Sequence, residues 1–476
     1  MMQTLIGTGA NLTCEAVDAF AESSGTAAFT ESATPRIAES HTNFMRHTAT
    51  GIPIYGTNTG FGPHVVTQTS GGEAQGAALI AHLGAGFGSA APNAVVRATM
   101  LLRLHTVGQG YSGASPNAVT AYRDLLHSGV FIAVPETGSV GASGDLVPLS
   151  HIARVLMESL PLSGRDALAL VNGTSFTTAY AALAVARTTR LLTIAETLTG
   201  WLYRLLGARP DALGETLNTL RGHPAQAESA ANIRREAERF GANYADDSRP
   251  LQEVYSIRCA PQVLGAIRTQ IAYARSVIEA EINGVDDNPV ITETGVLHGG
   301  NFHAQAVAFA ADALNAAVTQ IAVLAERQIA LLCTPSQHND FAPLLLAFEP
   351  GRDSGLAGAQ ITATALVAEM RGSCQCYAVS SIPTNADNQD VVPMATLAAQ
   401  AAYRQIARLS GVLAVLHIAL CQLDFLRHEH KATGKASPAP PHFPAWQPLR
   451  ADRALYDDIR RVAETFLTDS NIAQVK

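Results

Sequence analysis

Charged residues are scarce in this chain of 476 residues. Only 15% are Asp, Glu, Lys or Arg, against about a quarter in an average soluble protein. So little charge leaves less polar surface than a monomer needs, which indicates an oligomer in which alanine-rich helices are buried between subunits. The formal net charge is −8, so no basic excess indicates a partnership with nucleic acid or with an anionic membrane.

Cysteine is also sparse, and its spacing matches no zinc-binding pattern. We expect free, mostly buried thiols, no metal site and a reducing, cytoplasmic location. The residues from Met1 to Leu5 lack the basic and then apolar character of a signal peptide. No uninterrupted apolar run of about eighteen residues predicts a membrane span. The six cysteines are Cys14, Cys259, Cys333, Cys374, Cys376 and Cys421.

Long helical patterns dominate the second half of the chain. Residues 303–332 carry so few charges that a helix there must lie inside a bundle. We predict an all-α fold with a loop-rich N-terminal catalytic domain (residues 1–200), made of glycine-rich loops and short helices, and a central long-helix bundle (201–476). A Pro-, Gly- and Lys-rich stretch, 432–448, predicts a surface loop or linker. The expected long or terminal helices are 262–282, 303–332, 355–370, 394–428 and 452–467.

The most informative segment is Gly138–Ser150, with the sequence GSVGASGDLVPLS. At its centre, Ala142, Ser143 and Gly144 are small enough to let the chain fold back on itself. The amide of one residue can then attack a nearby carbonyl, and loss of water gives an electrophile that no standard side chain supplies. A plain glycine-rich turn is the alternative. A serine nucleophile elbow fails because Asp145 occupies the place of its last glycine.

This segment resembles the prosthetic-group loop of the histidine, phenylalanine and tyrosine ammonia-lyases. The resemblance implies that Ala142, Ser143 and Gly144 cyclise to 4-methylidene-imidazol-5-one (MIO), with no external cofactor. It also implies a homotetramer whose active sites each draw on three subunits, and a small-molecule amino acid substrate.

Tyr55 begins the sequence YGTNTGFG, which is similar to the mobile tyrosine loop of the same family. The resemblance implies that Tyr55 removes the β-proton of the substrate. A phenol has an ordinary pKa near 10, so its surroundings must activate it as a base. A phosphate-binding loop is excluded because no Gly-Lys-Ser/Thr follows.

The segment Gln252–Gln262, QEVYSIRCAPQ, is similar to the family's carboxylate-binding segment. Arginine has a planar fork that grips a carboxylate, and the resemblance gives this role to Arg258. It places Tyr255 and Gln252 beside the prosthetic group, where they handle protons. It also makes Asn172 a contact of the prosthetic group and the substrate, and Phe302 a wall of the pocket. We assign His303 a structural role.

Two positions bear on the substrate. By resemblance, His82 and Leu83 are the selectivity pair, and bacterial tyrosine lyases share this His-Leu pair. An imidazole at the end of an apolar pocket can bond a phenol hydroxyl and would be left unpaired by phenylalanine. Gln389 stands where histidine lyases carry glutamate, which argues against a histidine substrate. The alternative for His82 is a pocket-wall histidine without substrate contact.

Three acidic residues, Glu281, Asp286 and Asp287, precede Pro289. Metal ligation is one interpretation. Helix capping and turn formation explain them more simply, so we predict no metal here.

These motifs together predict an ammonia-lyase that converts L-tyrosine to trans-4-coumarate. A tyrosine 2,3-aminomutase, a phenylalanine ammonia-lyase and a non-catalytic scaffold are the alternatives. The chain departs from the family in a compact spacer between Gly62 and His82, in Pro393 and in Ala81. These departures bear on pocket size and aromatic preference more than on the type of reaction.

Overall fold

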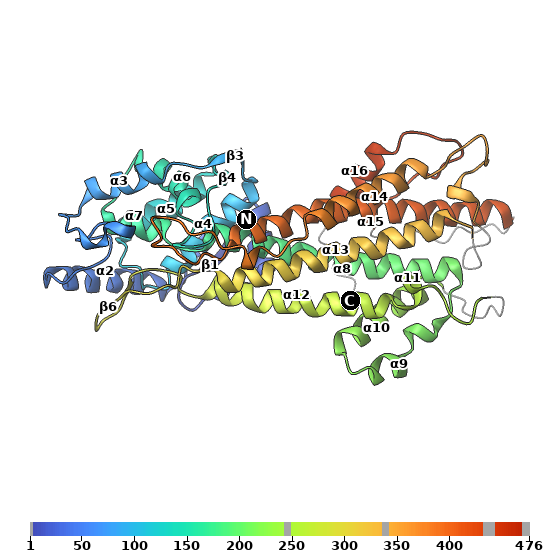
Figure 1. Cartoon of the computed structure of the whole chain (residues 1–476), viewed down its shortest axis with the longest axis horizontal. Helices are drawn as coiled ribbons and strands as arrows, with labels where there is room; N and C mark the ends of the chain where they lie inside the picture. Colours follow the sequence, from blue (N-terminus) through green and yellow to red (C-terminus); the bar gives the residue numbers. More distant parts are fainter. Residues whose placement is uncertain (1–2, 242–248, 336–341, 432–442, 469–476) are drawn as a thin grey trace. The chain divides into compact units, whose positions relative to one another are not determined.

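The computed structural model describes residues 3–241, 249–335, 342–431 and 443–468. These residues are mostly helical (Figure 1), which confirms the predicted all-α class. Residues 432–442 of the predicted linker lie outside the described part.

The chain divides into two compact units. Unit 1 contains residues 1–186, 274–312 and 376–403, and unit 2 contains residues 187–273, 313–375 and 404–476. The domain boundary predicted at residue 200 falls inside a long helix, α8 (Ser175–Leu206). The division into domains at that residue stays a prediction.

Unit 1 begins with short helices whose first turns are capped by side chains. Thr13, Ser115 and Ser163 each accept a hydrogen bond from a first-turn amide, which satisfies a donor that the helix leaves free. The helices are α1 (Cys14–Glu22), α2 (Ala33–Ala49), α3 (Glu73–Leu83), α4 (Asn93–Val107), α5 (Pro116–Ser128), α6 (Leu146–Met157) and α7 (Gly164–Val171). Helices α3, α6 and α7 pack on one another (Figure 1).

Three two-stranded sheets are present among the described residues, all in unit 1. Strands β1 (Gln3–Ile6) and β2 (Thr26–Phe29) are parallel, with Gln3 opposite Thr26. The pairs β3 (Phe87–Ala90) with β4 (Pro135–Thr137) and β5 (Val290–Ile291) with β6 (Val296–Leu297) are antiparallel. The β5–β6 hairpin leads to Phe302.

Four long helices each pass from one unit into the other. They are α8, α12 (Ala260–Asn283), α13 (Gln305–Cys333) and α15 (Ala395–Lys431). The last three match expected helices to within about three residues, whereas α8 was not predicted as a long helix. Its many threonines are the reason, because polar, β-branched residues interrupt the apolar pattern of a buried helix. Thr188 and Thr199 are nevertheless buried, and the hydroxyl of Thr199 donates to the carbonyl of Ala195 one turn earlier.

Unit 2 is completed by shorter helices, and two of them correspond to the expected helices 355–370 and 452–467. The helices are α9 (Glu215–Leu220), α10 (Pro224–Arg239), α11 (Tyr255–Arg258), α14 (Ala357–Gly372) and α16 (Tyr456–Thr468). Short 3-10 turns occupy Gly62–Val66 (η1), Pro210–Leu213 (η2), Leu344–Leu346 (η3) and Tyr377–Val379 (η4).

Three helical stretches are long and apolar enough to cross a membrane by length and composition alone: Gly164–Leu206, Gln305–Cys333 and Ala395–Glu429. Their most apolar windows are 100%, 67% and 89% buried inside the protein. A helix that packs against protein on nearly every side must be apolar on nearly every side, and this accounts for their composition.

The six cysteines are free, but they are less buried than expected. Cys14 and Cys333 are buried, whereas Cys374 and Cys376 are exposed. The exposed pair lies in the turn after α14, where no core surrounds it.

Candidate active site

The segment around Ser143 adopts an unusual, tightly folded backbone. Gly141, Ser143 and Gly144 have φ angles of +73°, +57° and +73°, in the left-handed region that non-glycine residues rarely adopt. A Cβ on Gly144 would lie 2.2 Å from the backbone nitrogen of Gly173, so only glycine fits. The predicted cyclisation requires the chain to fold back at Ala142–Gly144, and this backbone geometry is compatible with that requirement.

Neighbouring backbone segments hold this loop in place. The amide of Gly144 donates to the carbonyl of Phe302 (3.3 Å), and the amide of Asp145 donates to that of Gly173 (2.7 Å). Ala142 is buried and packs with Val392 and Met394. The loop is therefore fixed by contacts from three other parts of unit 1.

Asp145 anchors the loop between two helix starts. Its carboxylate accepts bonds from Ser139 Oγ (2.6 Å), Thr177 N (2.8 Å) and Thr177 Oγ1 (2.7 Å). Burial raises the pKa of Asp145, and these donors oppose the rise. Because Asp145 precedes α6 and bonds the first turn of α8, it joins the starts of both helices to the loop.

Tyr55 is held at both ends by single hydrogen bonds. Its backbone amide donates to Nε2 of His298 (3.1 Å), and its phenol oxygen accepts from the amide of Gly62 (2.8 Å). Phe61 packs edge-on against its ring at 6.1 Å. Burial raises the pKa of the phenol, while the Gly62 amide opposes the rise. One chain alone thus leaves Tyr55 a weaker acid than a free phenol.

A cavity of about 970 Å³ in unit 1 brings together six of the predicted site residues. The residues are Tyr55, His82, Ser143, Asn172, Phe302 and Gln389. Polar residues that we did not predict also line it: His64, Gln75, Asn288, Asn385 and Asn388. The three asparagines lie in loops. Asn288 follows Asp287, and Asn385 and Asn388 lie close to Gln389 in the chain, so only this proximity to residues already singled out could have identified them.

His82 lies in the last turn of α3 with its ring exposed. Its Nδ1 is 3.1 Å from the carbonyl of Ala78. A carbonyl can only accept, so Nδ1 carries the proton, and in the neutral ring Nε2 is left as an acceptor. Its predicted partner Leu83 is buried and is not among the residues that line the cavity.

Gln389 reaches the serine of the prosthetic-group segment. Its Nε2 donates to Ser143 Oγ at 2.6 Å, and its Oε1 accepts from Thr384 Oγ1 at 2.7 Å. Asn172, at the end of α7, donates through Nδ2 to the carbonyl of Asn288 (3.3 Å). Both amides therefore have a fixed orientation beside the cavity.

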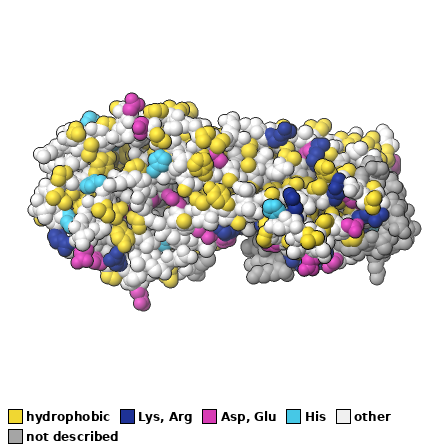
Figure 2. Space-filling model, turned by 60° about the horizontal axis from the view of Figure 1, so that its bottom comes forward, with side chains coloured by type: hydrophobic (Ala, Val, Ile, Leu, Met, Phe, Trp, Pro, Cys, Tyr) yellow, Lys and Arg dark blue, Asp and Glu magenta, His cyan; other side chains and the backbone are white. Residues whose placement is uncertain are grey.

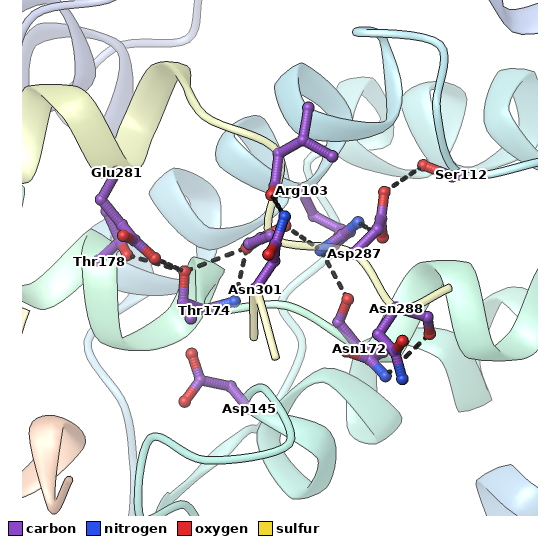
Figure 3. A network of polar contacts seen from close by, with 12 residues as sticks. Arg103, Ser112, Asp145, Asn172, Thr174, Thr178, Glu281, Asp287, Asn288 and Asn301 are labelled. Carbon is purple, nitrogen blue, oxygen red and sulfur yellow. Dashed lines mark hydrogen bonds and ion pairs between the residues drawn. The ribbon is translucent and has the colours of Figure 1, made fainter. Parts of the chain in front are cut away.

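A buried ionic network lies behind Asn172 (Figure 3). Arg103 of α4 donates to Asp286 Oδ1 (2.9 Å), to Asp287 Oδ1 (2.5 Å) and to the carbonyl of Asn172 (3.0 Å). Burial opposes the charge of Arg103, but Asp287 and Asp286 outweigh it and raise the pKa of the guanidinium. The arginine also packs so closely on Gly173 that a Cβ there would lie 1.7 Å from its Nη1.

This network corrects the assignment of the acidic residues to capping and turn formation. Asp286 and Asp287 pair with Arg103 in the interior, and Asp286 Oδ2 also accepts from the amide of Thr174 (2.6 Å). Glu281 accepts from Thr174 Oγ1 (2.5 Å), and burial raises its pKa to about 7. The available signal was Arg103 itself, which stands between leucines in the apolar sequence MLLRL of α4. Among the described residues, no group of three His, Cys, Asp or Glu residues could hold a metal.

Three predicted residues, Gln252, Tyr255 and Arg258, belong to unit 2 and are not among the residues that line this cavity. Arg258 stacks on Tyr255, with its Cζ 4.6 Å from the ring centre, and donates through Nε to the carbonyl of Glu253 (2.8 Å). Tyr255 is 70% exposed. Gln252 and Arg258 line a separate hollow of about 250 Å³. Their assigned roles stay predictions.

Comparison with known proteins decides the family. The sequence model of aromatic amino acid lyases matches residues 12–160 and 157–443. The chain belongs to the aromatic amino acid lyase family.

Relatives within this family act on different amino acids. A tyrosine ammonia-lyase of Cereibacter sphaeroides is 38% identical over an alignment that covers 88% of this chain and 89% of the relative. A histidine ammonia-lyase of Anaeromyxobacter dehalogenans is 34% identical, with 97% and 98% covered. The crystal structure of a tyrosine aminomutase from Streptomyces globisporus superposes with a TM-score of 0.87 at 31% identity, covering 98% of this chain and 97% of that chain. Family membership therefore establishes an aromatic amino acid lyase, whereas the identity of the substrate must be argued from the residues of the pocket.

Proposed function

We propose that this lyase eliminates ammonia from L-tyrosine to give trans-4-coumarate, using an MIO group formed by Ala142, Ser143 and Gly144. The observation that carries the proposal is that Tyr55, Ser143 and His82 line one cavity. The left-handed backbone at Ser143 and Gly144 fits the cyclisation. Once formed, the MIO group supplies an electrophile for the substrate amine.

Tyr55 takes the β-proton. The Gly62 amide, 2.8 Å from the phenol oxygen, stabilises the phenolate. Burial works against that charge, so the phenol needs a nearby positive charge to act as a base near neutral pH. The substrate ammonium and Arg258 are the cations that the proposed site offers.

Arg258 holds the substrate carboxylate from another subunit. In one chain, Arg258, Tyr255 and Gln252 are grouped in unit 2, with Tyr255 largely exposed. We infer a homotetramer in which these three residues complete the cavity of a neighbouring copy. The exposed apolar side chains, of which Figure 2 shows many on the visible face, support such an assembly.

His82 reads the phenol hydroxyl. Its Nδ1 is engaged by the Ala78 carbonyl, so Nε2 accepts from the hydroxyl of tyrosine. Phenylalanine leaves that acceptor without a partner, which costs binding in the transition state. Gln389, a neutral amide, offers no charge to pair with the imidazole of histidine.

The test is ultraviolet spectroscopy of the purified protein with L-tyrosine, L-phenylalanine and L-histidine in separate reactions, followed by chromatography of the products. We expect a coumarate band with tyrosine alone and none in Ser143→Ala. His82→Phe should shift the preference toward phenylalanine by about tenfold or more. Turnover of histidine, or full activity of Ser143→Ala, would contradict the proposal.

A tyrosine 2,3-aminomutase is the second candidate, because a solved aminomutase has the same fold over 98% of this chain. Such an enzyme would return the ammonia to the β-carbon before release. β-Tyrosine as the main product, with little coumarate, would favour it.

A further inference from the structure

The segment Thr384–Gln389 forms a closed loop beside Ser143. The amide of Thr384 donates to the carbonyl of Gln389 (3.0 Å), and the amide of Gln389 donates back to the carbonyl of Thr384 (3.3 Å). Between them, Asn385, Ala386 and Asp387 have φ angles of +57°, +54° and +58°. Three successive non-glycine residues in this region cost about 1–2 kcal/mol each. Such strain at a functional site calls for a reason in what the loop presents.

The loop presents the side-chain amide of Gln389. Thr384 Oγ1 donates to Gln389 Oε1 at 2.7 Å, and Gln389 Nε2 donates to Ser143 Oγ at 2.6 Å. The threonine hydroxyl therefore fixes which end of the amide faces the serine. Ser143 Oγ is the side-chain oxygen that must leave when the electrophile forms, so the contact is made before any substrate binds.

We propose that Gln389 assists the maturation of the prosthetic group by donating a hydrogen bond to the departing hydroxyl of Ser143, and that Thr384 is the residue that positions Gln389. This inference rests on the proposed function. It assigns Gln389 a second task beside its contribution to the pocket, and gives Thr384 a role that its sequence position did not indicate.

The chemistry balances without an oxidant. The nitrogen of Gly144 forms a bond to the carbonyl carbon of Ala142. That carbonyl oxygen leaves as one water with the protons of the Gly144 and Ser143 amides, and a C=N bond remains. Ser143 then loses its Cα proton and its Oγ hydroxyl as a second water, and a Cα=Cβ bond remains. A donor at Oγ stabilises the negative charge that develops on this second leaving group.

Intact mass measurement follows maturation directly, independently of turnover. The full-length protein is expressed, translation is stopped, and the fraction of chains that have lost none, one or two waters is measured over time. We expect two lost waters in the wild type. In Gln389→Met, which lacks the donor, we expect the loss of the second water to slow by about a hundredfold, so that the one-water species accumulates.

Thr384 is tested with a pair of variants. Thr384→Val removes the hydroxyl that orients the amide and should slow the second loss by about threefold to tenfold. Thr384→Ser keeps the hydroxyl and should mature like the wild type. Thr362→Val on α14, where the hydroxyl bonds only the carbonyl of Gly358, is the matched control. Circular dichroism and gel filtration establish that each variant is folded.

The two proposals fail separately. A folded wild type that loses no water would remove the MIO group and with it the proposed function. A wild type that loses two waters while Gln389→Met and Thr384→Val do so equally fast would overturn only the assistance by Gln389 and Thr384.

Discussion

The two loops that meet at the cavity are supported very differently. The Ser143 loop is fixed by the buried carboxylate of Asp145 and by backbone hydrogen bonds with Phe302, Ala304 and Gly173, and Gly173 in turn packs against Arg103. The Tyr55 loop has one bond at each end of its tyrosine, most of its other hydrogen bonds join residues 52–75 to one another, and residues 64–68 are exposed. The Ser143 loop must be rigid, because its cyclisation needs an amide held against a carbonyl. The Tyr55 loop must move, because a loop that carries a base above the substrate has to open before the substrate can enter.

The largest effect is expected where a side chain is added inside the rigid loop. Gly144→Ala places a Cβ 2.2 Å from a backbone nitrogen at a φ of +73°, so the loop cannot keep its fold. We expect no loss of water by intact mass and no measurable turnover. Gly62→Ala is the matched change in the Tyr55 loop: its φ of +52° strains an alanine in the same way, but the Cβ would meet only the Asn385 side chain, at 2.8 Å, and no backbone atom. It should mature fully and lose only part of its activity; equal damage in the two variants would contradict the comparison.

The Arg103 network is the next test of rigidity. Arg103→Met leaves Asp286 and Asp287 buried without their cation, which should lower the free energy of unfolding by about 3–5 kcal/mol. Chemical denaturation measures this loss. Arg123→Met, which breaks an exposed pair with Asp124 on α5, should change stability by at most about 0.5 kcal/mol. A small effect at Arg103 would mean that the network does not stiffen the loop.

How far the sequence predicts this molecule follows from the same contrast. Local patterns identified three of the four long helices and the small residues of the Ser143 loop, because helical periodicity and runs of small residues are visible in the sequence. Helix α8 was missed, and the Tyr55 loop was identified by resemblance to the family. Arg103 was missed because its partners Asp286 and Asp287 lie more than 180 residues away along the chain. Arg258 was recognised only by resemblance, and its place in unit 2 cannot be read from spacing. The contact of Gln389 with Ser143 likewise depends on a fold that brings residues 246 positions apart together.

Tyr55→Phe separates chemistry from stability. Removing a general base should lower kcat by about a hundredfold or more, with KM nearly unchanged. Stability should fall by only about 1 kcal/mol, since one hydrogen bond to Gly62 is lost. Steady-state kinetics and denaturation measure the two effects, and Tyr456→Phe, at an exposed ring, is the control. An unchanged kcat would remove Tyr55 from the mechanism.

The smallest effect concerns the bond that tethers the Tyr55 loop to His298. Nε2 of His298 accepts from the Tyr55 amide, so this nitrogen must be unprotonated. Burial lowers the pKa of His298, and Arg165 lowers it further. The neutral ring of His298 therefore makes its whole contribution to the free energy of unfolding above the ordinary histidine pKa of about 6.5. This contribution is lost as the pH falls through the lower pKa of His298 in the folded state.

His298→Gln supplies a side-chain oxygen that can accept at every pH. At a pH below the pKa of His298, we expect kcat/KM of this variant to exceed that of the wild type by about threefold to tenfold. Near neutral pH the two values should be similar. His223→Gln, at an exposed histidine before α10, should leave the profile unchanged. If kcat/KM of His298→Gln falls at low pH as steeply as that of the wild type, the bond between His298 and Tyr55 does not control the loop.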